Sequence, residues 1–142
     1  MTAQSSGRDA APRSGGSKPE YFPVDLPLAS GVTIYGHAIV AVDTSGNARP
    51  GRASTSDKIL GISEETVINP SGGTKRTRGI RRCVASFKNA AADALTAAHI
   101  GNAAYVHDDQ TFGASAGGAR VQGGIFVGFD PDVSGNVLVQ VG

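Results

Sequence analysis

The stretch GHAIVAVDTSGN, residues 36–47, decides the fold of this chain. Its first half is apolar and rich in β-branched side chains, which fit the pleated, half-buried surface of a strand. Its second half, DTSGN, predicts a tight reversal, because Asp bonds its own backbone while Gly and Asn tolerate a positive φ. We therefore expect a strand that runs into a hairpin turn.

The same pattern returns near the C-terminus. Residues 125–136, IFVGFDPDVSGN, again join an apolar run to Asp-x-Ser-Gly-Asn, and residues 104–112, AYVHDDQTF, are a looser version. Three strand-turn units favour an all-β domain built from hairpins. They carry no catalytic chemistry of their own.

The composition agrees with many short strands joined by tight turns. The chain has 142 residues with 20 Gly, no Trp and only 6% aromatic residues, and a single domain of this size buries roughly two-thirds of its unfolded surface. The formal net charge of +1 gives no strong electrostatic argument for a nucleic-acid or membrane partner. No apolar run approaches the ~20 residues that span a bilayer. The single cysteine, Cys83, excludes an internal disulfide.

The chain divides into a flexible N-terminal arm, residues 1–20, and a β-domain, residues 21–142. The arm is rich in Ser, Gly and Ala and has little to bury, which predicts disorder in isolation. It is either a solvated tail or an arm that orders on a partner surface. The β-domain begins at YFPVDLPL, where Pro23 and Pro27 predict extended chain or an edge strand.

We predict a small β-sandwich or barrel-like domain of short antiparallel strands, with one short helix and the extended N-terminal arm. Gly61 marks a bulge or a close backbone approach, and residues 89–100, NAAADALTAAHI, predict the helix, of one to two turns. Residues 48–57 have loop composition, and residues 69–74 form a Gly-rich turn. The expected strands cover residues 32–35, 39–42, 58–68, 80–88, 103–107, 120–129 and 137–141.

The reactive side chains match no catalytic or metal-binding motif. His99 and residues 107–109, HDD, have no recognised ligand spacing, and paired Asp residues are what a hairpin turn favours. Cys83 lies in an apolar strand, which favours a small buried side chain over a nucleophile. We therefore predict a non-enzymatic protein that holds no cofactor and no metal.

Basic residues gather in residues 75–82, which contain Lys75, Arg76, Arg78, Arg81 and Arg82. Single-stranded nucleic-acid sites interleave such charges with stacking aromatics, and this run has none. Direct nucleic-acid binding is therefore the least favoured interpretation. Docking on an acidic protein surface and simple solvation both remain open.

The order of the motifs gives a further lead. The hairpin motif of residues 36–46 is followed by ILGISEE at 59–65, LTAAHIGNAAYV at 95–106 and GIFVGFD at 124–130. This succession resembles the small capsid decoration (cement) proteins of tailed bacteriophages. The resemblance covers roughly residues 21–142 and rests on Gly and aliphatic patterns.

The resemblance implies a structural protein of the virion that is made in the host cytoplasm and sits on the outer capsid surface, usually as a homotrimer. Its partner would be the major capsid protein, with no nucleic acid and no membrane involved. A protein that binds the assembled shell and not the separate subunits stabilises that shell by mass action, and bridging several subunits adds avidity. Charge and flexibility select the candidate capsid contacts, which are Arg8, Arg13, Lys18, Arg49, Arg52, Lys75, Arg76 and Arg78.

Apolar residues on both faces of residues 39–42 and 125–129 exceed what one small core needs. We therefore expect a second apolar face in each segment that is buried between subunits. The alternative function is a β-sandwich module that recognises a receptor or glycan on a virion spike or fibre. The absence of Trp counts against it, because sugar sites usually present exposed aromatics.

Overall fold

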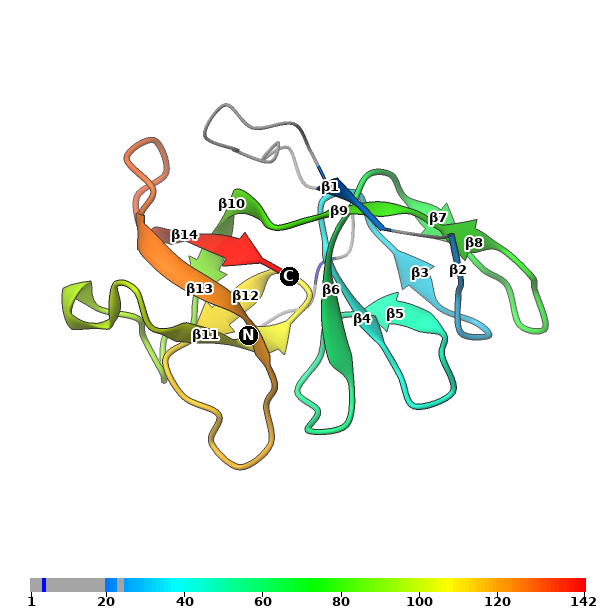
Figure 1. The fold of residues 1–142 in the computed structure, drawn as a ribbon, viewed down its shortest axis with the longest axis horizontal. Helices are drawn as coiled ribbons and strands as arrows, with labels where there is room; N and C mark the ends of the chain where they lie inside the picture. The colour runs from blue at the N-terminus through cyan, green and yellow to red at the C-terminus, as the bar shows by residue number, and fades with distance from the viewer. Residues whose placement is uncertain (1–3, 5–19, 23–24) are drawn as a thin grey trace.

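The computed structural model describes Gln4, residues 20–22 and residues 25–142. Almost all regular structure in these residues is β, which confirms the predicted all-β class (Figure 1). The strands form a closed barrel, a central five-stranded sheet and two small ladders. In Figure 1 the barrel lies on the left, the five-stranded sheet in the middle and the ladders on the right.

The barrel contains the C-terminal half of the chain and closes in the order β10-β12-β11-β13-β14. The predicted closing hairpin is confirmed, because β13 and β14 pair antiparallel from Phe129↔Val137 to Gly124↔Val141. Val137, Val139 and Val141 are fully buried, as the alternation of apolar residues predicted. The bounds of the barrel strands are β10 (Cys83–Asn89), β11 (Ala103–Asp108), β12 (Thr111–Gly113), β13 (Gln122–Phe129) and β14 (Asn136–Val141).

The central sheet has the order β1-β9-β6-β4-β5, with β1 (Glu20–Tyr21), β9 (Gly79–Arg81), β6 (Lys58–Ser63), β4 (Ile39–Val42) and β5 (Ala48–Pro50). Its β4–β5 hairpin confirms the motif of residues 36–47: Asp43 Oδ1 accepts the amides of Ser45 and Asn47, both at 3.0 Å. The expected loop at 48–57 is wrong for its first three residues, because these pair with β4 as β5.

Two ladders lie on the side of the central sheet that faces away from the barrel. One pairs β2 (Leu26–Pro27) with β8 (Arg76–Thr77), and the other pairs β3 (Thr33–Ile34) with β7 (Val67–Ile68). A single strand over 58–68 is therefore wrong, since its end leaves the central sheet as β7. The prediction for Gly61 is confirmed: the β4–β6 register shifts there, and a Cβ would lie 2.2 Å from the Ile80 carbonyl oxygen.

The central sheet separates two hydrophobic cores. Ile39 packs with the barrel side chains, while its neighbour Val40 packs with Phe22, Leu28 and Ile34 beneath the ladders. Neighbouring strand residues face opposite sides of a sheet, so β4 contributes to both cores. The expected subunit-facing apolar side of residues 39–42 is therefore wrong, because both faces are buried within one chain.

Two local departures from the predicted elements have clear causes. The expected strand at 80–88 is split at Arg82, which has a φ of 55° and turns the chain from β9 in one sheet to β10 in the other. The predicted helix is reduced to one 3-10 turn, Ala97–His99. The Asn89 side chain bonds both the amide and the carbonyl of Leu95, at 2.8 and 3.0 Å, and so holds the preceding residues in a loop.

Candidate interaction surface

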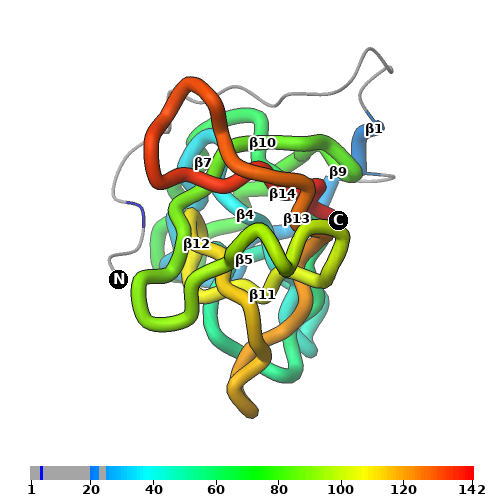
Figure 2. Tube along the Cα trace, turned by 90° about the vertical axis from the view of Figure 1, so that its left-hand side faces the viewer, coloured from blue at the N-terminus to red at the C-terminus, as the bar shows by residue number. Residues whose placement is uncertain are grey.

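Four exposed apolar side chains lie on the barrel strand β13, on the loop that follows it, or on the segment beside it. We call Ile100, Val127, Phe129 and Val133 the barrel-end patch; these side chains are 42–51% exposed. Residues 100–102 lie beside β13, because the Gly101 amide donates to the Phe126 carbonyl at 2.8 Å. Figure 2 looks onto this part of the barrel, where the β13–β14 hairpin lies toward the viewer.

The barrel-end patch rests on well-ordered structure. The register of β13 shifts between Phe126 and Gly128, so Phe126 points into the core while Val127 is exposed. The Phe129 ring packs edge-on against Phe126, with 5.4 Å between ring centroids. The Asn136 amide donates to the carbonyl of Val133 at 3.1 Å and holds the loop that carries it. The patch is thus positioned before any partner arrives.

Of the candidate capsid contacts predicted from the sequence, Arg8, Arg13 and Lys18 lie outside the described residues. Arg49, on β5, forms an ion pair with Asp43 at 3.5 Å. Arg52 donates two hydrogen bonds to the buried Asp57 carboxylate, at 2.6 and 3.2 Å. These hydrogen bonds hold the pKa of Asp57 below its ordinary value, although burial opposes the shift.

The basic run is bound to acidic residues at the start of the β-domain. Arg76 donates to the Asp25 carbonyl at 2.7 Å, and Arg78 pairs with the Asp25 carboxylate at 3.4 Å while lying over the Tyr21 ring. Lys75 is exposed in the turn before β8. These residues belong to the ladder side in Figure 1, so the structure does not bring them together with the barrel-end patch.

The segment that contains Leu28 and Ala29 lies between β5, which carries Arg49, and the basic run, which starts at Lys75. The Leu28 amide donates to the Lys75 carbonyl and the Ala29 amide donates to the Ala48 carbonyl, both at 2.9 Å. The start of β5 and the start of the basic run therefore flank the same extended segment. Among the described residues, the side chains of Arg49, Arg52, Arg76 and Arg78 contact the local partners given above. Lys75 is exposed.

A polar cluster around Asp93 was missed by sequence reasoning. Its carboxylate lies 3.0 Å from His107 Nε2, accepts the Ser115 hydroxyl at 2.9 Å and lies 3.8 Å from Arg120. Burial raises the pKa of Asp93, but the hydrogen bonds from His107 and Ser115 outweigh it and leave the pKa below its ordinary value. No short motif joins residues 93, 107 and 115, so the sequence carried no signal for this cluster.

The Asp93 cluster has the residue types of a hydrolytic triad but not its hydrogen bonds. The Ser115 hydroxyl donates to Asp93 and not to His107, so the imidazole does not activate it as a nucleophile. Gly113 is required beside the cluster, since a Cβ there would lie 2.2 Å from His107 Nε2. The cluster ties the 113–120 loop to the barrel.

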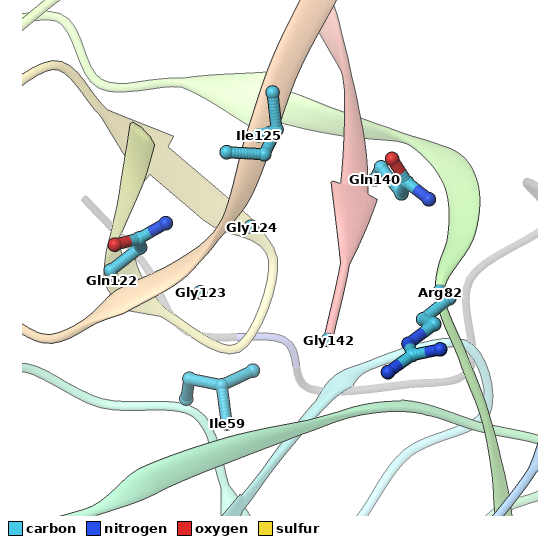
Figure 3. A pocket seen from close by; sticks show the side chains of 8 residues that line it. All are labelled: Ile59, Arg82, Gln122, Gly123, Gly124, Ile125, Gln140 and Gly142. Atoms are coloured by element: carbon cyan, nitrogen blue, oxygen red, sulfur yellow. The ribbon is translucent and has the colours of Figure 1, made fainter. Parts of the chain in front are cut away.

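A shallow pocket of about 300 Å³ lies where the barrel meets the central sheet (Figure 3). Arg82 is the one side chain with a titratable group in its lining, and its guanidinium lies 3.6 Å from Glu20. Its other polar side chains are the amides of Gln122 and Gln140, which donate and accept hydrogen bonds but do not titrate near neutral pH. The lining residues are Ile59, Arg82, Gln122, Gly123, Gly124, Ile125, Gln140 and Gly142.

Within the described residues, no group of three or more His, Cys, Asp or Glu side chains is placed to hold a metal ion. In the same part of the chain, no helix has the length and apolar character needed to cross a membrane. Comparisons with protein-family models, curated proteins and solved structures found no match to this chain.

Proposed function

We propose that this chain is a structural protein that binds the exterior of an assembled phage head and stabilises it by bridging major capsid subunits. The barrel-end patch is the observation that carries the proposal. Its four exposed apolar side chains belong to β13 and the segments next to it, and exposed apolar side chains on one side of a well-packed domain favour a protein-binding surface. The patch includes Val127 and Phe129 of the GIFVGFD motif, through which the sequence resembles capsid decoration proteins.

The size of the patch sets a limit on what one copy achieves. Fully burying an Ile, Val or Phe side chain contributes about 1.5–3 kcal/mol, and these four side chains are about half exposed. Covering all four therefore contributes about 3–6 kcal/mol, which is less than many estimates of the cost of association. Stable attachment requires further contacts or several linked copies, in agreement with a trimer that bridges several capsid subunits.

Selective binding to the assembled shell supplies the stabilising mechanism. A contact formed only with neighbouring capsid subunits in place shifts the equilibrium toward the assembled head by RT ln(1 + [L]/Kd) for each site. At a free concentration of about 100 times Kd this amounts to about 2.7 kcal/mol per site. Many sites on one shell add together, so no chemical reaction is needed.

The test is binding to expanded, undecorated heads of the same phage, measured by co-sedimentation and imaged by cryo-electron microscopy. We expect saturable binding of the unaltered protein and an apparent affinity up to about tenfold weaker for each copy of Phe129→Ser, since about 1.4 kcal/mol of lost burial is a factor of ten. Ile68→Ser is the matched control, because Ile68 is 66% exposed on β7, away from the patch.

Two outcomes would count against the proposal. Absence of saturable binding to the heads would overturn it and favour the receptor- or glycan-recognition module instead. Equal losses in Phe129→Ser and Ile68→Ser would show that the barrel-end patch is not the contact surface.

A further inference from the structure

Gln4 is buried against the β-domain even though it lies far from it in the sequence. The residue is 8% exposed. Its backbone amide donates to Asp109 Oδ1 at 2.6 Å, and its side-chain Nε2 donates to the Gly36 carbonyl at 3.0 Å. These contacts join residues that are separated by 105 and 32 positions, so they are tertiary contacts and not local turn bonds.

The acceptor at Gly36 is created by the turn that precedes β4. The Ala38 amide donates to the Tyr35 carbonyl at 3.1 Å, and His37, at the third position of the turn, has a φ of 61°. A positive φ at this position is the mark of a type II turn. The closing bond uses the Tyr35 carbonyl, and buried Ser63 bonds both Tyr35 and Ala38. The Gly36 carbonyl is thereby held in place for Gln4.

The acceptor at Asp109 is created by the β11–β12 hairpin. The Asp109 carbonyl accepts the Ile39 amide at 2.9 Å, and the Gln110 amide donates to Asp108 Oδ1 at 3.0 Å. Asp109 is only 1% exposed. These bonds do not involve Gln4, and they hold the backbone of the hairpin that carries Asp109 and of the turn that carries Gly36.

We propose that Gly36 and Asp109 form a docking site for the N-terminal segment, and that Gln4 is the residue which this site recognises. The site selects a peptide that offers a main-chain N–H to a carboxylate and a primary amide to a carbonyl.

The inference concerns the free protein and does not depend on the proposed function. It also has a consequence for that function. If a partner binds Gln4 itself, docking of Gln4 on the β-domain competes with that contact. Glutamate has the same shape as glutamine but would set a carboxylate against the Gly36 carbonyl and near Asp109. Gln4→Glu therefore removes docking without removing side-chain volume.

The first test is amide hydrogen exchange on the full chain, followed by mass spectrometry. We expect Gln4→Glu to exchange about tenfold faster over residues 1–7, because the variant loses the Nε2 bond to the Gly36 carbonyl and sets a carboxylate against that acceptor. Gln122→Glu is the matched control, since it makes the same change at an exposed glutamine on β13. Equal exchange over residues 1–7 in the unaltered protein and in Gln4→Glu would overturn the proposal.

The second test adds the N-terminal segment as a separate peptide. The peptide MTAQSSG, which copies residues 1–7, is titrated into the full-length Gln4→Ala protein and followed by NMR. We expect saturable shifts at the amides of Gly36 and Asp109, and none with MTAESSG. The unaltered protein should respond less, because its own segment competes at an effective concentration in the mM range. Absence of shifts at Gly36 and Asp109 in the variant would overturn the proposal.

Discussion

Arg52 and Asp57 form a charge pair in which one partner is exposed and the other is buried. The Arg52 side chain is 46% exposed and that of Asp57 is 1% exposed. The hydrogen bond from Arg52 is the main reason that the pKa of Asp57 lies below its ordinary value of 3.8. A carboxylate with a lowered pKa contributes stability above the ordinary pKa, and this contribution is lost as pH falls through the folded-state value.

Removing the guanidinium should therefore destabilise the protein in a pH-dependent way. We expect Arg52→Ala to lower the free energy of unfolding by about 1–2 kcal/mol near neutral pH, a range reduced because solvent reaches Arg52. The difference should shrink as pH falls below 3.8. Urea unfolding over a range of pH measures both effects. Arg49→Ala is the control and should cost at most about 0.5 kcal/mol, since its pair with Asp43 is longer and the Asp43 carboxylate is more exposed than that of Asp57.

At the same scale, the sequence identified charged residues but not their partners. Arg52 was chosen as a capsid contact for its charge, yet its partner lies five residues away in the same loop. The contacts of Gln4 and of Asp93 bring together distant positions without a motif. Side-chain pairing of this kind depends on tertiary placement, which single-sequence patterns do not encode.

At the scale of elements, Arg82 connects the two sheets. Its φ of 55° lies in the left-handed region, which costs a residue with a side chain about 1–2 kcal/mol. The Arg82 amide donates to the Val141 carbonyl at 2.7 Å, so the bend is fixed to the last barrel strand. β9 and β10 can therefore belong to different sheets although they are almost continuous in the sequence.

Substitutions at Arg82 should separate backbone strain from charge. We expect Arg82→Val to lower the free energy of unfolding by about 1–3 kcal/mol, because a β-branched residue tolerates a positive φ poorly. Arg82→Gly should stay within about 1 kcal/mol of the unaltered protein. Arg81→Val is the matched control, since Arg81 also pairs with Glu20 but lies within β9. Equal effects of the two valine substitutions in denaturant unfolding would contradict this account.

The elements that the sequence predicted well have a local signal. β4, its turn and the β13–β14 hairpin combine apolar strand residues with Asp and Gly turn chemistry. The errors at 58–68 and 80–88 have one cause. Apolar residues continue along the chain while it passes from one sheet to another, and strand propensity does not record which neighbour a strand will pair with.

At the scale of the whole molecule, β4 joins two cores through adjacent residues. Ile39 belongs to the barrel core and Val40 to the core beneath the ladders. Loss of packing on either side therefore disturbs the strand that both cores share. We expect barrel and central sheet to unfold in one cooperative transition. The sequence showed that β4 is apolar on both faces, but not that a single chain covers both.

Cys83 allows this cooperativity to be measured. It is 3% exposed at the start of β10, and burial raises the pKa of its thiol to about 11, so it should react with alkylating reagents only after the barrel opens. We expect Val40→Ala, in the opposite core, to cost about 2 kcal/mol and to speed alkylation about thirtyfold. Val127→Ala, at an exposed site, should change neither. Unchanged alkylation in Val40→Ala would indicate that the two cores open separately.

Closure of the barrel has a further consequence for how copies of this protein behave when crowded. Among the described residues, the parallel β10–β12 pair and the antiparallel β10–β14 pair close the barrel sheet, so that none of its strands has an unpaired edge. The outer strands of the central sheet are short, and β5 ends at Pro50, which has no amide to donate. Such edges resist strand-by-strand aggregation. Many copies can therefore be concentrated at one place without polymerising through their sheets.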